Sequence, residues 1–387
     1  MHNAKVLFCP MAEGVGLGPL SQLLGVAEEL TLRGGRCAFL INESHAPMVR
    51  RLGHKYYVAP KPLRGDLHAP DFRMSDAARA LGVVDSDYLD QAIASELAAI
   101  DEFKPTVLMS ATKLTVPASA RLRGLPLVSI AATPDGPEFQ SPLYDAAGLP
   151  DARPEEVVRV MARHGVEVRS DIAELSYMHS SYAVSAAYQA FDPFLRHDNL
   201  SYVGPLACKG IDLYTPLSEL GSRPLITVYI NRGSADVQMY LQVLSSVAAD
   251  MSAFQFVVIE RAEPIDLTVP ANMSVVPEAP IGRLLSESRA LISGGGQNAI
   301  MLSLLAGVPV LGIRGPSAER DFNLRRVEAL GAGLIVEPPV EASAVCSALS
   351  KLVKDANYQH AAAAASAALR QLQGAGGVAN LLLDIAR

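Results

Sequence analysis

The chain has 387 residues, of which 50% are hydrophobic and 19% are charged. This composition fits about two globular domains with large cores and excludes a chain that is disordered throughout. The 33 Lys and Arg residues against 40 Asp and Glu residues give a net charge of −7, which argues against a general nucleic-acid-binding protein.

The cysteines and the apolar segments favour a cytoplasmic protein. The four cysteines are scattered and include no CxxC pair, so the sequence predicts neither a zinc site nor a disulfide framework. We identify no signal peptide and no apolar run of the ~18–20 residues that would span a bilayer, and we therefore expect no integral membrane segment.

The first half of the chain alternates short apolar runs with helical patterns. Strands are expected at residues 5–10, 37–41, 106–109 and 127–130, and helices at 20–30 and near 118–123. Such alternation predicts a parallel sheet with right-handed crossovers. Residues 150–189 are expected to be mainly helical. Asp85 and Asp87 are interpreted as caps of a helix start, not as metal ligands.

The strand–helix pattern restarts after a stretch of Gly, Ser and Pro that has the character of an interdomain linker. In this second half, strands are expected at residues 225–230, 256–259, 275–276, 290–292, 308–311 and 334–336, and a helix at 237–249. Two α/β halves joined by one linker predict a two-lobed protein. Ligands in such sheets bind outside the carboxyl ends of the strands, and here we expect them between the lobes.

A glycine-rich junction follows the strand at 290–292. Ser293 is followed by Gly294, Gly295 and Gly296, and a helix is expected to begin near Asn298. Glycine lets the backbone approach a phosphate, and the amides and dipole of the helix favour a negative charge. The residues therefore predict an anion site, although a tight turn without a ligand remains the alternative.

A polar segment follows the strand at 308–311, at the same edge of the predicted sheet. It contains Glu319, Arg320 and Asn323. A carboxylate at this position can accept hydrogen bonds from the hydroxyl groups of a ligand. The alternative is a solvated helix start, because acidic residues are favoured in the first turn of a helix.

Together these segments resemble the C-terminal half of a family 1-like glycosyltransferase of the GT-B fold. The family pattern His-Gly-Gly-x-Gly-Thr, Gly-Val-Pro and Asp-Gln-x-x-Asn-Ala corresponds to residues 293–298, 307–309 and 319–324. Residues 232–234, 278–280 and 330–333 fit the same order. The resemblance covers most of residues 224–340 and is weaker in the N-terminal half.

The resemblance implies two Rossmann-like α/β domains. Residues 1–209 would bind the acceptor, residues 210–223 would form the linker, and residues 224–374 would bind the nucleotide sugar. A helix in residues 375–387 would cross back to the first domain.

The resemblance also implies roles for individual donor-binding residues. Gly294, Gly295, Gly296, Gln297 and Asn298 would hold the diphosphate through backbone amides. Outside this loop, the Ser234 hydroxyl would contact a phosphate, and the backbone of Ala279 would contact the base of the nucleotide. Glu319 and Arg320 would contact the hydroxyl groups of the sugar. Ser293 stands where the family pattern has His. Glu278 stands where the family has an aromatic residue that stacks on the base of the nucleotide. The resemblance implies no metal in the site and no cofactor.

The family's catalytic His/Asp dyad is missing. Gly16 and Ser110 occupy the two positions, and neither side chain can act as a general base. Glu13 or Asp135 is a candidate replacement, although each also fits an ordinary loop or turn. Alternatively, positioning and leaving-group stabilisation carry the reaction, or the chain has lost catalysis.

The sequence thus predicts an inverting glycosyltransferase that moves a sugar from a UDP- or TDP-sugar to a small-molecule acceptor, as in antibiotic biosynthesis. The acceptor would lie against residues 63–89 and 135–144. The rival readings are a catalytically inactive, glycosyltransferase-like binding protein and a nucleotide-sugar epimerase. The sequence is compatible with a homodimer and does not fix the oligomeric state.

Overall fold

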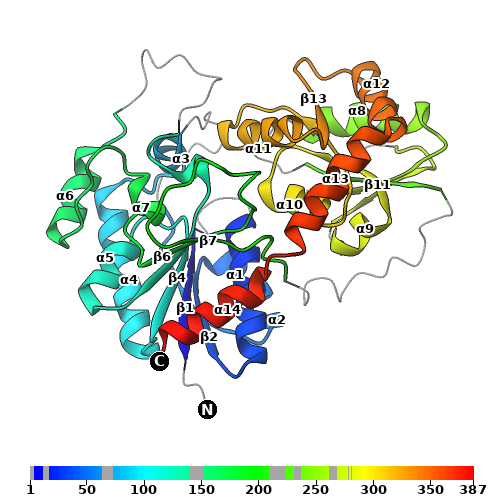
Figure 1. Cartoon of the computed structure of the whole chain (residues 1–387). Helices are drawn as coiled ribbons and strands as arrows, with labels where there is room; N and C mark the ends of the chain where they lie inside the picture. Colours follow the sequence, from blue (N-terminus) through cyan, green and yellow to red (C-terminus); the bar gives the residue numbers. More distant parts are fainter. Residues whose placement is uncertain are drawn as a thin grey trace. The chain divides into compact units, whose positions relative to one another are not determined.

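The computed structural model divides into two compact units, which Figure 1 shows as two α/β assemblies. Unit 1 comprises residues 1–208 and 372–387, and unit 2 comprises residues 209–371. The residues that the structure describes are 4–11, 17–62, 73–139, 151–208, 223–230, 237–260, 268–277, 279 and 281–387. The predicted linker at 210–223 lies almost wholly outside them.

Unit 1 is built on a parallel sheet. Within the described residues it has seven strands in the order β3-β2-β1-β4-β5-β6-β7. They are β1 (Lys5–Pro10), β2 (Arg36–Ile41), β3 (Lys55–Val58), β4 (Val107–Ala111), β5 (Leu127–Ile130), β6 (Tyr182–Ser185) and β7 (Leu200–Tyr202). The central strands are buried on both faces, and their sequences are accordingly mainly apolar, with the buried Ser110 in β4 and Ser129 in β5 as exceptions.

Helices follow most of these strands. They are α1 (Gly18–Leu32), α2 (Ala46–Arg51), α3 (Met74–Ala80), α4 (Ser86–Phe103), α5 (Val116–Arg123), α6 (Glu155–Arg163) and α7 (Glu174–Tyr177), with 3-10 turns η1 (Glu43–His45) and η2 (Thr133–Asp135). The predicted cap is confirmed for Asp85, whose carboxylate accepts hydrogen bonds from the backbone N–H of Asp87 at 3.0 Å and of Tyr88 at 3.1 Å, whereas Asp87 lies in the first turn of the helix. This cap fixes where α4 begins.

One part of the segment predicted to be helical is instead a strand. Residues 150–189 contain α6 and α7, but Tyr182–Ser185 form β6 and pair in parallel with β5 and β7. A run of four residues is too short for its periodicity to distinguish a strand from a helix. The hydrogen-bonded pairing with β5 and β7 makes Tyr182–Ser185 a strand.

The chain returns to unit 1 through its last helix, α14 (Gly374–Ile385). Figure 1 shows this red helix beside the blue α1. The backbone N–H of Gly374 donates to the carbonyl of Val203 at 2.7 Å, and Arg33 Nε donates to Asn380 Oδ1 at 3.1 Å. Segments from the two ends of the chain therefore stabilise the same unit.

Unit 2 repeats the architecture. Its described residues form a six-stranded parallel sheet in the order β10-β9-β8-β11-β12-β13. The strands are β8 (Leu225–Tyr229), β9 (Gln255–Ile259), β10 (Met273–Val276), β11 (Ser288–Ser293), β12 (Val310–Ile313) and β13 (Gly333–Val336). The helices are α8 (Val237–Asp250), α9 (Ile281–Glu287), α10 (Gln297–Leu305), α11 (Ala318–Ala329), α12 (Ala342–Lys354) and α13 (Ala356–Leu369). The prediction of two parallel α/β sheets is confirmed.

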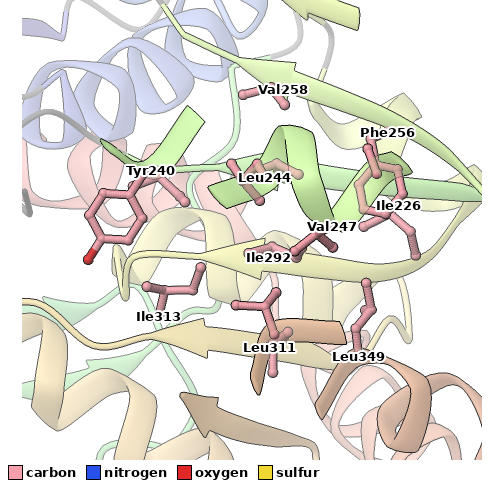
Figure 2. Close-up of a cluster of buried hydrophobic side chains, with 14 of the residues drawn as sticks. Ile226, Tyr240, Leu244, Val247, Phe256, Val258, Ile292, Leu311, Ile313 and Leu349 are labelled. Carbon is pink, nitrogen blue, oxygen red and sulfur yellow. The ribbon is translucent and has the colours of Figure 1, made fainter. Parts of the chain in front are cut away.

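A fully apolar core fixes β11 within the sheet of unit 2 (Figure 2). Ile292 of β11 lies opposite Val228 of β8 and Leu311 of β12. It belongs to the same buried cluster as Val247 of α8 and Leu349 of α12. All five side chains are buried. Burial of each large aliphatic side chain stabilises the fold by about 1.5–3 kcal/mol, so the point where β11 ends is rigidly defined.

Both sheets reverse their strand order at one point. In unit 1, β1 lies between β2 and β4, and in unit 2, β8 lies between β9 and β11. The crossovers on the two sides of such a switch point leave in opposite directions, so the loops after these strands diverge and leave room for a ligand. Each unit therefore has one preferred ligand position. In unit 1 it lies beyond the ends of β1 and β4, and in unit 2 beyond the ends of β8 and β11.

We predict that Gly25→Ala destabilises unit 1, whereas Gly18→Ala in the same helix does not. A Cβ atom on Gly25 would lie 2.7 Å from the carbonyl oxygens of Leu206 and Ala207, whereas a Cβ on Gly18 meets nothing within 4 Å. The crowded variant should lower the free energy of unfolding by about 1–3 kcal/mol. Urea denaturation followed by circular dichroism measures both. Equal stability of the two variants would contradict this packing.

Candidate functional site

The glycine loop after β11 turns back on itself at the switch point of unit 2. Ser293 ends the strand with only 1% of its surface exposed, and its hydroxyl accepts a hydrogen bond from the backbone N–H of Gly295 at 3.1 Å. Gly295 has a φ of +95°, a conformation that disfavours any side chain. The local hydrogen bond and this torsion angle together shape the loop.

Gly295 also lies directly against the start of α11. A Cβ atom at this position would come within 2.6 Å of the carbonyl oxygen of Arg320 and 2.8 Å of its Cβ. Such distances to backbone atoms cannot be relieved by a side-chain rotation. Glycine is therefore required at position 295 both by torsion angle and by close packing.

Helix α10 begins immediately after this loop, with Gly296 as its N-cap residue. No side chain caps the helix at Gly296, and its first turn contains no acidic residue. The first turn of a helix presents backbone N–H groups that have no partner within the helix, and its dipole adds a partial positive charge. A helix start with these features is of the kind that can receive an anion.

Asn323 connects this loop to the first turn of α11. Its side-chain Nδ2 donates to the carbonyl of Gly295 at 3.0 Å and to Glu319 Oε1 at 3.1 Å. Asn323 is only 1% exposed, and its hydrogen bond to Gly295 is buried, whereas its hydrogen bond to Glu319 is part-buried. The structure thus brings Glu319 and Arg320 beside the glycine loop, as the sequence predicted for their strand edge. Asn323 is a positioning residue that the predicted set of site residues does not include.

An ionic network centred on a buried aspartate also fixes this helix. Asp321 of α11 has a side chain with 0% exposure, and its two oxygens pair with Arg314 Nε at 2.8 Å and Arg325 Nε at 3.0 Å. Glu337, just after β13, pairs with both arginines. Burial alone would lower the pKa of Arg314, but the hydrogen bond to Glu337 and the charge of Asp321 raise it. Arg314 therefore stays charged and holds α11 to the sheet.

The other predicted donor-binding residues are only partly described. Ala279 is half-buried and packs with the apolar cluster that contains Ile259 and Leu284. Ser234 and Glu278 lie outside the described residues. The individual contacts of all these residues with a donor remain predictions.

In unit 1, the candidate base Asp135 ends the 3-10 turn that follows β5, and it is half-exposed. Thr133 of the same turn donates its backbone N–H to Asp192 Oδ2 at 3.0 Å, and the Ser176 hydroxyl donates to the carbonyl of Asp135 at 2.7 Å. Burial, together with the nearby charges of Asp135 and Asp192, raises the pKa of Tyr177. The backbone around Asp135 is thus well held.

The other predicted catalytic positions contribute less. Glu13 and Gly16 lie outside the described residues. Ser110 is 1% exposed in β4, and its hydroxyl has no hydrogen-bond partner in the described structure. The described residues bring together no metal-ligating group of three or more His, Cys, Asp or Glu side chains. None of their helices has the length and apolar character to cross a bilayer.

Comparison with known proteins connects this geometry to a family. The family model for the C-terminal domain of erythromycin biosynthesis protein CIII-like proteins matches residues 242–372. The chain is also similar to a PGL/p-HBAD biosynthesis rhamnosyltransferase of Mycobacterium bovis (strain BCG / Pasteur 1173P2), with 25% identity over 306 residues. That match covers 70% of this chain and 65% of the relative, so the chain spans just under two thirds of the relative's length.

Solved structures show the same fold over the whole chain. The calicheamicin glycosyltransferase CalG4 superimposes with a TM-score of 0.75 and 18% identity, covering 100% of this chain and 98% of CalG4. The glycosyltransferase VinC, crystallised in complex with DTDP, gives a TM-score of 0.75 with 16% identity and 99% coverage of both chains. The predicted GT-B fold and the resemblance to family 1-like glycosyltransferases are confirmed.

We predict that Asn323→Ala lowers the free energy of unfolding by about 1–3 kcal/mol, because it leaves the buried carbonyl of Gly295 without its donor. Asn357→Ala is the matched control, because Asn357 is exposed at the start of α13 in the same unit. The control should change stability by less than about 0.5 kcal/mol. Urea denaturation monitored by circular dichroism provides the comparison. A neutral Asn323→Ala variant would show that the Asn323 bridge does not hold the loop.

Proposed function

We propose that this GT-B chain, a relative of the family 1-like natural-product glycosyltransferases, is an inverting glycosyltransferase. It would move a sugar from a UDP- or TDP-sugar to a small-molecule acceptor. The observation that carries the proposal is the glycine loop at the switch point of unit 2. There α10 begins without a side-chain cap, next to Arg320 and to Glu319, which Asn323 holds.

The donor diphosphate would bind to the backbone amides of residues 294–298. This interaction supplies partial positive charge without a metal ion, because the helix dipole and the amides are oriented before the ligand arrives. The Ser234 hydroxyl would also contact a phosphate, and the backbone of Ala279 would contact the base of the nucleotide. The complex of VinC with DTDP supports nucleotide binding on the shared fold.

Glu319 and Arg320 would contact the hydroxyl groups of the donor sugar. Asn323 supports this role because it ties Glu319 Oε1 to the glycine loop through a single amide. The Arg314–Asp321–Arg325 network adds rigidity to the same helix. A sugar and its diphosphate would therefore be held in one fixed relationship, which lowers the entropic cost of reaching the transition state.

In the reaction, the acceptor oxygen would attack the anomeric carbon from the face opposite the nucleotide. The bond to the diphosphate breaks as the new glycosidic bond forms, and the configuration inverts. Amides of residues 294–298 would stabilise the negative charge that develops on the leaving diphosphate. Asp135 or Glu13 would accept the proton of the acceptor, and Asp135 is supported by its half-exposed position at the carboxyl end of β5.

A catalytically inactive binding protein of the same fold is the second candidate. It is favoured by Ser110, which cannot act as the acid that usually orients the catalytic His. Both candidates require donor binding, so turnover separates them. We place either activity in the cytoplasm, where scattered free cysteines such as Cys9 and Cys208 stay reduced.

We predict that the protein binds UDP or TDP and that Gly295→Ala weakens this binding by about tenfold or more through displaced loop amides. Gly307→Ala is the matched control: Gly307 lies at the other end of α10 with a φ of +74°, but a Cβ there has no neighbour closer than 3.9 Å. Isothermal titration calorimetry measures both variants. Equal nucleotide affinities would reject the loop as the diphosphate site.

We predict that the catalytic base is revealed by separate Asp135→Asn and Glu13→Gln variants. Loss of the true base should lower kcat by about 10²–10⁴-fold, with little change in nucleotide affinity. The assay follows release of UDP or TDP from donor sugars in the presence of hydroxylated acceptors, with the exposed Asp198→Asn as control. Full activity in both test variants eliminates both bases. Nucleotide binding without any turnover in the wild type favours the inactive binding protein.

A further inference from the structure

The edge of unit 1 where its strands begin has no part in the proposed function. Strands β2, β1, β4 and β5 pair in parallel, so all four begin at this edge, opposite the switch-point end. Helices α1, α4 and α5 end just before β2, β4 and β5, so their last turns reach the same edge. Residues from four strands and three helices therefore share one surface.

Three cationic side chains lie next to one another at this edge. Lys5 begins β1 and lies opposite Arg36, which begins β2. Lys104 follows α4, and Thr106 next to it is tied to β1, because its backbone N–H donates to the carbonyl of Lys5 at 2.7 Å. Arg36 and Lys104 are exposed. Within the residues that the structure describes, none of the three cations forms a salt bridge.

The acidic residues at the end of α4 do not neutralise these cations. Glu102 pairs with Lys55 at 2.6 Å. Asp101 accepts two hydrogen bonds from Arg123, at 2.8 and 2.7 Å. Each carboxylate thus already balances another cation, and the edge keeps three positive charges that have no counter-charge among the described residues.

The positive charges at this edge repel one another. Partial burial lowers the pKa of the Lys5 ammonium. The charges of Arg36, Lys104 and Lys55 lower it further. The ring of Phe103, whose centre lies 5.1 Å from Lys5 Nζ, gives this ammonium a favourable contact. A chain with a net charge of −7 thus maintains one surface of the opposite sign, and an anionic partner would remove the repulsion there.

Two exposed leucines flank the cations. Leu32 ends α1 and is 76% exposed, and Leu122 lies in the last turn of α5 and is 41% exposed. Leu32 precedes β2 and Leu122 precedes β5, which is three strands away in the order β2-β1-β4-β5. At ~4.8 Å between strands, the row is about 14 Å long. Cations beside protruding apolar side chains are typical of surfaces that bind the headgroup region of a bilayer.

We infer that this basic edge, formed by Lys5, Leu32, Arg36, Lys104 and Leu122, is a docking surface for an anionic lipid bilayer. The cations would contact lipid phosphates, and the leucines would enter the headgroup region. A bilayer is favoured over an acidic protein because it takes isolated leucines without a shaped pocket. The inference is independent of the proposed function, since the basic edge lies opposite the ligand position of unit 1.

The first test measures cosedimentation of the full chain with lipid vesicles. Phosphatidylcholine vesicles are compared with vesicles in which about 30% of the lipid is phosphatidylglycerol. We expect at least about tenfold stronger binding to the anionic vesicles at low salt. Salt of about 0.5 M should remove most of this difference, because it screens exposed charges. Equal binding to the two kinds of vesicle would overturn the inference.

Charge-removing variants test whether the basic edge makes the contact. Arg36→Gln and Lys104→Gln should each weaken binding to anionic vesicles by about fivefold. Lys351→Gln and Lys354→Gln are the matched controls, because both lysines are exposed on α12 of unit 2, and they should bind as the wild type does. The same loss in test and control variants would show that net charge alone governs binding and would contradict a docking surface.

A fluorescent reporter shows which edge of unit 1 meets the lipid. The chain contains no Trp, so Leu32→Trp places a single reporter in the basic edge. We expect its emission to move to shorter wavelength when anionic vesicles are added. Val58→Trp is the control, because Val58 is 53% exposed at the end of β3, on the opposite edge of the sheet, and its emission should stay unchanged. A shift at both positions or at neither would contradict the assigned orientation.

Soluble polyglutamate stands in for an acidic protein. If polyglutamate binding requires Arg36 and Lys104 while neither kind of vesicle binds, the basic edge is a protein-docking surface and the bilayer inference is wrong. Circular dichroism should show that the exposed substitutions leave folding intact. Nucleotide titration of the same variants should match the wild type, so loss of vesicle binding and failure of the proposed function remain distinguishable.

Discussion

The donor site proposed in unit 2 depends on one constraint: the backbone amides at the start of α10 would have to face the ligand while the loop before them stays fixed. Gly295 meets this constraint by packing against the backbone of Arg320 without a side chain. Asn323 then holds the carbonyl of Gly295, so the loop cannot turn away from α11. The polar surface that would receive a diphosphate is therefore made by main-chain atoms, and the side chains serve to hold it.

The two parallel sheets share one topological feature. Each has a switch point where diverging crossovers leave room beyond the strand ends. Unit 2 places neutral amides and a helix dipole there, which suits a strongly charged diphosphate. The proposed donor site in unit 2 follows from this environment.

Much of the fold could be predicted from the sequence, because buried parallel strands are short apolar runs and helices begin and end at recognisable residues. The strand at Tyr182–Ser185 was missed because four residues are too few for the spacing of apolar residues to distinguish a strand from a helix. Only its pairing with β5 and β7 defines it as a strand. The donor-loop residues were found because glycine at a strand–helix junction is a local signal. Whether they bind a donor stays a prediction.

Sequence reasoning could not supply the contacts between distant segments. Asn323 reaches a carbonyl 28 residues away, and the buried Asp321 is balanced by Arg314 and Arg325. An i,i+4 spacing hints at the Asp321–Arg325 pair, but nothing local indicates that Asp321 is buried.

The most direct test of the central claim is a crystal structure of the full chain with TDP or UDP bound. The account predicts diphosphate oxygens within hydrogen-bonding distance of backbone nitrogens between Gly294 and Asn298, with the loop held by Asn323 as described. A nucleotide bound elsewhere, or side chains covering these nitrogens so that no phosphate can approach, would contradict it.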